Sequence, residues 1–235
     1  MSKEIKANSL SEAAGTILAK LFYGAADEVG PRITEKAGTF RGENSIKIIE
    51  AAAVKYEENA ITGQEHPSLR LAYKALEEGS WVENSQIQEM WSGLLVSSCS
   101  EDGKDEGNLI FISILGQLTA PQVKILNFAC ANAEVELSEA GLMWSPGTLE
   151  VDLESLRSIA EIDELHMLDR QLDHMRSLEL IKSGFHPSHT NADVTPTALA
   201  LYMYASCQGF MGPPEEFYKN RLQSDDVVTA ETSEE

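Results

Sequence analysis

Residues 85–95 read Ser-Gln-Ile-Gln-Glu-Met-Trp-Ser-Gly-Leu-Leu, which is a clear helical pattern. The apolar residues of this stretch are Ile87, Met90, Trp91, Leu94 and Leu95. They recur three and four positions apart, as they do on the buried face of an amphipathic helix. Asn84 or Ser85 is suited to cap the start of this helix, because short polar side chains accept hydrogen bonds from the first free N–H groups.

The same period extends in both directions along the chain. Apolar stripes of helical spacing run through residues 10–26, 33–56, 69–79, 109–118 and 119–129. Thr119 is placed to cap the last of these helices, with Pro121 in its first turn. We therefore predict an all-α (mainly helical) fold class, with a helical domain over residues 8–133.

The pattern changes in the C-terminal third. Helical stretches at 152–160 and 162–178 are followed by Leu180–Gly184, which is typical of a short strand, and by a polar turn. Asp193–Thr195 is suited to form the returning strand before another helix. This order predicts a small winged-helix-like domain with a two-stranded β-hairpin over residues 148–210. The acidic residues 222–235 are expected to form a disordered tail.

Composition limits the classes of partner. Eighteen Lys and Arg stand against 38 Asp and Glu, a formal net charge of -20. Nonspecific nucleic-acid binding depends on cations that displace phosphate counterions, so this charge disfavours it. Cys99, Cys130 and Cys207 are odd in number and form no CxxC pair, which favours buried free thiols in a reducing compartment. We see no signal peptide or spanning segment and expect a cytoplasmic protein.

Two stretches carry a family resemblance. The first runs from Ala26-Asp27-Glu28-Val29-Gly30 to Arg41-Gly42-Glu43-Asn44 and on to Ala51. The second runs from His66-Pro67 to Gly79-Ser80 and then through residues 86–95. Together with 111–126 they resemble the opening helices of the abortive-infection alpha (Abi-alpha) family, over residues of about 20–130. One departure is Ile87, where the family pattern prefers Leu.

The resemblance implies a role in phage defence through growth arrest or death of infected cells. It supplies no catalytic residues and no cofactor, so we assign none. The family-motif positions are Gln88, Trp91, Leu94 and Leu95. Trp91, Leu94 and Leu95 share one helix face. We interpret Trp91 as a core anchor, with a ligand pocket built on Trp91 as the alternative.

The helix predicted at 162–178 offers a possible interaction surface: Arg170, Gln171, His174 and Arg176. In a winged helix this segment would be the recognition helix, whose side chains reach bases and phosphates. Asp169 and Asp173 lie on the same helix and would repel phosphates. We therefore prefer a structural or protein-binding role and keep a DNA-binding regulator as the alternative.

The only metal-like cluster on this helix consists of His166, Asp169, Asp173 and His174. Zinc uses such residue types, but the HExxH order of a zinc protease is missing. Neighbouring arginines can pair with the carboxylates three or four positions away. A solvated charged face is the preferred interpretation, and a metal-dependent enzyme that uses His166 and His174 is the alternative. Nucleophile-elbow and phosphate-loop motifs are absent from the sequence.

The first helix, from Leu10 to Ala26, has a substantial apolar face but few cations. Interfacial membrane helices usually carry a basic polar face, so core packing is preferred over membrane association. The leading hypothesis is a non-enzymatic antiviral defence protein that acts through contacts with a protein partner or as a homo-oligomer.

Overall fold

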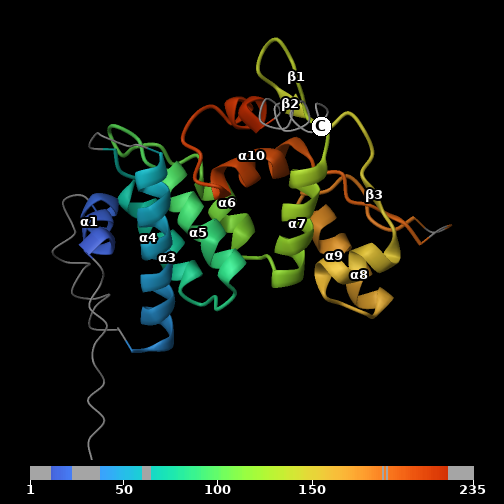
Figure 1. Cartoon of the computed structure of the whole chain (residues 1–235), viewed down its shortest axis with the longest axis horizontal. Helices are drawn as coiled ribbons and strands as arrows, with labels where there is room; N and C mark the ends of the chain where they lie inside the picture. The colour runs from blue at the N-terminus through green and yellow to red at the C-terminus, as the bar shows by residue number, and fades with distance from the viewer. Residues whose placement is uncertain (1–11, 23–37, 60–64, 187, 189, 222–235) are drawn as a thin grey trace, which may run out of the picture. The chain divides into compact units, whose positions relative to one another are not determined.

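The computed structural model describes residues 12–22, 38–59, 65–186, 188 and 190–221. This part of the chain is mostly helical (Figure 1), so the predicted all-α class is confirmed. Contacts divide it into two compact units. The first unit holds the described residues up to Leu118 and also Ser206–Met211, and the second holds Thr119–Ala205 and the described residues from Gly212 onward. The predicted tail at 222–235 and parts of the helical stretches predicted at 10–26 and 33–56 lie outside the described residues.

The helices of the first unit are α1 (Glu12–Leu21), α3 (Phe40–Glu58), α4 (Leu69–Gly79), α5 (Ser85–Ser97) and α6 (Leu109–Leu115). Helix α5 packs against α3, α4 and α6, and α1 packs against α3. Fully buried side chains of α5 include Met90, Trp91, Leu94 and Leu95. Burying one large apolar side chain contributes about 1.5–3 kcal/mol, so α5 is the centre of this core.

Short polar side chains cap the starts of α3, α4 and α5. Thr39 accepts a hydrogen bond from the Gly42 N–H at 3.2 Å and starts α3. Ser68 and Asn84 cap α4 and α5 in the same way. The cap predicted at Asn84 or Ser85 is therefore Asn84, whose Oδ1 lies 3.1 Å from the Ile87 nitrogen.

The second unit begins with α7 (Ala120–Asn132), which packs against α8 (Leu153–Ala160) and α9 (Leu165–Ser177). Thr119 and Gln122 form a capping box at the start of α7, which confirms the predicted cap. Most of α10 (Ala198–Cys207) also belongs to this unit, and residues 214–221 form a helix that the sequence did not predict.

Short strands connect these helices. Strands β1 (Glu136–Leu137) and β2 (Met143–Trp144) pair as an antiparallel hairpin, and β3 (Glu150–Val151) pairs with β4 (Ala192–Asp193). On the other side of β4, Phe185 bridges Ala192 and Ile181 bridges Pro196. The two segments that the sequence paired therefore lie antiparallel. Strand β3 pairs with β4 as a third segment that the sequence did not predict, because a strand of two residues is too short to show an alternating pattern.

Helix boundaries differ from the sequence in two places. The helix expected over 109–118 ends at Leu115, because Gly116 caps it and Thr119 already begins α7. The helix expected from 162 begins at Leu165, because Glu161 takes a left-handed conformation (φ 54°) at the end of α8. Helix α7 was placed in the 8–133 domain by the sequence, whereas its contacts group it with the second unit. The domain limits at 133 and 148 stay predictions.

Within the described residues, no helix combines the length and the apolar character that a transmembrane span requires. The apolar face of α1 is buried in the first unit, with Ile17, Leu18 and Leu21 each at most 5% exposed.

Candidate functional site

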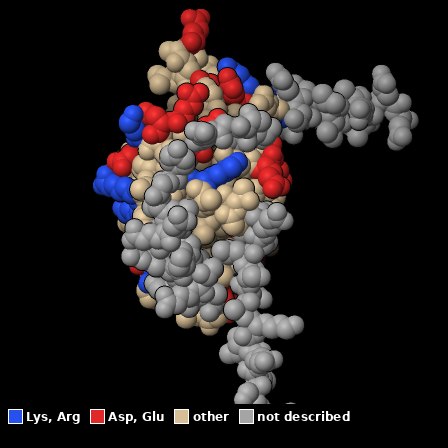
Figure 2. All heavy atoms as spheres, turned by 90° about the vertical axis from the view of Figure 1, so that its left-hand side faces the viewer, with Lys and Arg blue, Asp and Glu red and all other residues tan. Residues whose placement is uncertain are grey.

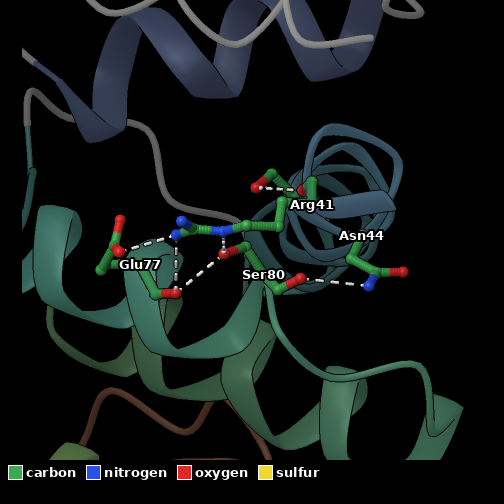
Figure 3. Close-up of polar contacts among 5 residues, drawn as sticks. Arg41, Asn44, Glu77 and Ser80 are labelled. Atoms are coloured by element: carbon green, nitrogen blue, oxygen red, sulfur yellow. Dashed lines mark hydrogen bonds and ion pairs between the residues drawn. The ribbon is translucent and has the colours of Figure 1, made fainter. Parts of the chain in front are cut away.

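The two family-like stretches meet in a buried polar network of the first unit (Figure 3). Asn44 of α3 donates its Nδ2–H to the carbonyl of Ser80, at the end of α4, over 3.1 Å. Gln88 of α5 donates its Nε2–H to Asn44 Oδ1 at 3.2 Å and to the Val82 carbonyl at 2.7 Å. The side chains of Asn44, Ser80 and Gln88 are each less than 10% exposed. The network therefore joins α3, α4 and α5 through groups that satisfy one another.

Arg41 connects the buried network to the protein surface. Its Nε donates to Ser80 Oγ at 2.8 Å, and its terminal nitrogen pairs with Glu77 Oε1 at 2.7 Å (Figure 3). The guanidinium also lies 4.3 Å from the ring centroid of Trp81, which is 61% exposed. A cation over an indole face is worth about 0.5–1 kcal/mol at an exposed site. Arg41 thus fixes Glu77, Ser80 and Trp81 at one end of α4.

A glycine allows Trp91 to reach the end of α4. A Cβ on Gly79 would lie 2.8 Å from Ile48 Cδ1 and 3.0 Å from Trp91 Cγ. The buried Nε1 of Trp91 has no hydrogen-bond partner among the described residues. Leaving a buried donor unpaired costs about 1–3 kcal/mol, so packing of the ring outweighs this loss. Trp91 lies in the core, as the sequence interpretation preferred.

The structure separates the four residues of the possible interaction surface on α9. Gln171 and His174 turn toward the start of α7, where His174 Nδ1 lies 2.9 Å from Gln122 Nε2 and Gln171 Oε1 accepts from Thr119. Arg170 is exposed, and Arg176 pairs with Asp173 at 2.6 Å. Two of the four side chains therefore help to hold α9 on α7, and the two arginines remain at the surface.

The metal-like residues of α9 do not converge. No group of three or more His, Cys, Asp or Glu side chains within the described residues has an arrangement that could hold a metal ion. His166 and Asp169 are exposed, while His174 faces Gln122 and Asp173 pairs with Arg176. Helical spacing alone suggested the cluster, and the packing of α9 on α7 divides it.

A hollow of about 790 Å³ lies beside the start of α9. It is lined by Glu164, Leu165, His166, Asp169, Phe185, His186, Ser188 and Thr190. His186 Nδ1 accepts a hydrogen bond from the Ser188 N–H at 3.2 Å, so two lining residues of the hollow are bonded to each other. The hollow has a mixed lining in which Glu164 and Asp169 would repel an anionic ligand.

The thiols are unsuited to nucleophilic work. Cys99, Cys130 and Cys207 are all buried thiols. Burial, followed by the charge of Glu65, raises the pKa of Cys99 to about 12. Burial also raises the pKa of Cys130 well above its usual range. The thiolate is the reactive form of cysteine, so Cys99 and Cys130 act as small core residues at neutral pH.

Many cations of the described residues are held by carboxylates. Ion pairs join Arg41 to Glu77, Lys55 to Glu89, Arg70 to Glu106, Lys124 to Glu161, Arg157 to Glu154 and Arg176 to Asp173. On the face shown in Figure 2, Lys and Arg side chains are interspersed with Asp and Glu among the atoms that are not grey. Paired cations of this kind give a surface little affinity for phosphates.

Sequence reasoning selected Gln88 and Trp91 but did not single out their partners. Asn44 and Arg41 stood in the first family-like stretch, three positions apart, so their spacing on one helix face was a usable signal. Ser80, Gly79 and Trp81 gave no such signal, because their roles depend on the end of α4 meeting α3 and α5.

Comparison with known proteins gave one family. The model of the family described as "Abortive infection alpha" matches residues 43–200. The match includes Asn44, Ser80 and Gln88 of the polar network, and it extends through α9 into α10. No curated protein and no solved structure matches the chain.

Proposed function

The chain belongs to the abortive infection alpha family, and from this membership we propose that it is a non-enzymatic phage-defence protein that acts through contacts with other proteins. One observation carries the non-enzymatic part. The polar side chains of the family-like stretches, Asn44 and Gln88, are buried and bonded to each other and to helix-end carbonyls. Groups used in this way hold a scaffold together and are not placed to touch a substrate.

The second unit supports a protein-binding role within this proposal. Its element order, with β3, α8, α9 and then two antiparallel segments around β4, is the order of a winged helix. On α9, however, Asp169 and Asp173 lie among the residues that would meet DNA, and Asp173 already holds Arg176. We therefore propose a winged-helix-like unit that presents α9 to a protein partner or to a second copy of the chain.

Infection of cells that express the chain tests the proposal. We expect fewer plaques on cells that express the intact protein, and at a high ratio of phage to cells we expect culture growth to stop without release of progeny. Arg170→Ala combined with Arg176→Ala should weaken protection at unchanged protein abundance, because it removes the exposed cations of α9. Trp91→Ala, which empties the core, serves as the misfolded control.

Two results would contradict the proposal. Infected cells that survive and divide would show protection without abortive infection. A band shift of duplex DNA at low salt that the double arginine variant loses would favour the DNA-binding regulator instead, because phosphate contacts weaken steeply as salt rises.

A further inference from the structure

The β1–β2 hairpin has two different faces. Glu136 pairs with Trp144 and Leu137 pairs with Met143, so side chains alternate between the faces along each strand. Met143 and Ser145 are 2% and 3% exposed and form the inner face. Leu142 and Trp144 are 65% and 39% exposed and lie on the outer face, with Glu136 opposite Trp144 on β1 and Glu134 two residues before it.

The inner face holds the hairpin in place. An isolated two-stranded hairpin is marginally stable in water, so burial of Met143 is needed to keep it formed. Lys182 adds a hydrogen bond from its Nζ to the Ser145 carbonyl at 2.7 Å. Figure 1 shows the hairpin extending beyond the end of α7. The contacts of the inner face therefore keep the hairpin folded while its outer face stays exposed.

The outer face combines apolar area with negative charge. Trp is among the residues that contribute most at protein interfaces, especially when it lies beside a second apolar group such as Leu142. Glu136 is exposed opposite Trp144, and two further carboxylates lie close to the hairpin: a Cβ on Gly147 would lie 3.6 Å from Glu134 Oε2, and a Cβ on Gly141 in the turn would lie 3.5 Å from Glu215 Oε1. A partner that covers Trp144 must also meet these carboxylates.

We propose that the outer face of the β1–β2 hairpin binds a cationic segment of a partner protein, which places an apolar side chain against Trp144 and Leu142 and its Lys or Arg near Glu134 and Glu136. The inference rests on the proposed function, because it names the kind of partner through which the protein acts. Charge complementarity selects this occupant. A second copy would bring the same carboxylates to a symmetric contact, where like charges oppose each other.

A short fluorescein-labelled peptide of alternating Lys and Leu is the probe, with a peptide of alternating Glu and Leu as its control. Fluorescence anisotropy with the full chain should show binding of the Lys peptide that weakens as salt rises, and no binding of the Glu peptide. Trp144→Ala should raise Kd about tenfold or more, as loss of an interface hot spot does. Glu134→Gln combined with Glu136→Gln should also raise Kd and should flatten the salt dependence.

Trp81→Ala is the matched control, because Trp81 is an exposed tryptophan of the first unit. It should bind the Lys peptide with the Kd of the intact chain. The inference is overturned if the Lys peptide does not bind, or if Trp144→Ala and Trp81→Ala bind it equally well. It is also overturned if sedimentation shows a dimer of the intact chain that Trp144→Ala dissociates. Phage protection is measured separately, so a protective chain that ignores the peptide would refute only this inference.

Discussion

Gly79 and Trp91 touch: a Cβ on Gly79 would lie 3.0 Å from Cγ of the indole and 2.8 Å from Ile48 Cδ1. The end of α4 can therefore rest on the ring of α5 only if residue 79 has no side chain. The buried network of Asn44, Ser80 and Gln88 lies at this same helix end. Close packing and polar pairing thus fix one junction of α3, α4 and α5.

Gly79→Ala should destabilise the protein. Alanine favours a helix by about 0.8–1.0 kcal/mol over glycine, but an overpacked core costs about 1–3 kcal/mol, so we expect a net loss. Urea unfolding followed by circular dichroism measures it. Gly15→Ala in α1 is the control, since a Cβ there would have no atom within 4 Å, and it should leave stability unchanged or raise it. A gain at Gly79 equal to that at Gly15 would contradict the packing argument.

Asn44 and Gln88 should be energetically coupled. Asn44→Ala removes the acceptor of the Gln88 amide and the donor to the Ser80 carbonyl, and unpaired buried polar groups cost about 1–3 kcal/mol. A double-mutant cycle of Asn44→Ala and Gln88→Ala should give a coupling energy of about 0.5 kcal/mol or more.

The control cycle combines Asn44→Ala with Tyr218→Phe. Tyr218 belongs to the second unit, where its hydroxyl donates to the Leu201 carbonyl at 3.0 Å. These two changes share no partner and should be additive within about 0.5 kcal/mol. Equal coupling in both cycles would mean that the network does not link α3 to α5 specifically.

The sequence predicts features that depend on residues close together in the chain better than features that depend on distant residues. Periodicity placed α5, and local chemistry placed the caps Asn84 and Thr119, because a cap acts on N–H groups only a few residues away. The role of Ser80 was beyond reach, since it is fixed by side chains 36 and 39 positions away in the chain.

The α9 residues also show that local spacing does not determine which side chains are paired with another helix. Helical spacing grouped His166 with His174, but only the position of Gln122 on α7 determines that His174 is paired within the unit. The β1–β2 hairpin was missed because its strands have two residues each and leave only a tryptophan and a proline as signals.

Gly93→Ala should release the segment Ser206–Met211 from the first unit. A Cβ on Gly93 would lie 1.8 Å from the Cys207 carbonyl oxygen, a backbone atom that no rotamer change can move. Because Cys207 is 2% exposed, its thiol should react slowly with a disulfide reagent in the intact chain and much faster in the variant. The measurement is made in a chain that also carries Cys99→Ala and Cys130→Ala, so that Cys207 is the only thiol that can react. Unchanged reactivity would show that the helices adjust without releasing the segment.

Stability should fall as pH rises above about 9, and Cys99 should account for part of the fall. The pKa of its thiol is raised from 9.0 to about 12 by burial and then by Glu65, against a smaller opposing effect of Lys20. Between these two values the unfolded chain loses the thiol proton and the folded chain keeps it, so raising the pH favours unfolding. For a thiol with these values the loss at pH 10 is about 1 kcal/mol.

Urea midpoints at pH 8 and pH 10 measure this effect, with Cys99→Ala beside the intact chain. The variant loses the contact of Sγ with the Leu95 carbonyl at both pH values, so the informative quantity is the difference between the two midpoints. That difference should be smaller in Cys99→Ala but should not vanish, because burial also raises the pKa of Tyr56 to about 12. An equal pH dependence in the two proteins would mean that the Cys99 thiol ionises as readily in the folded chain as in the unfolded one.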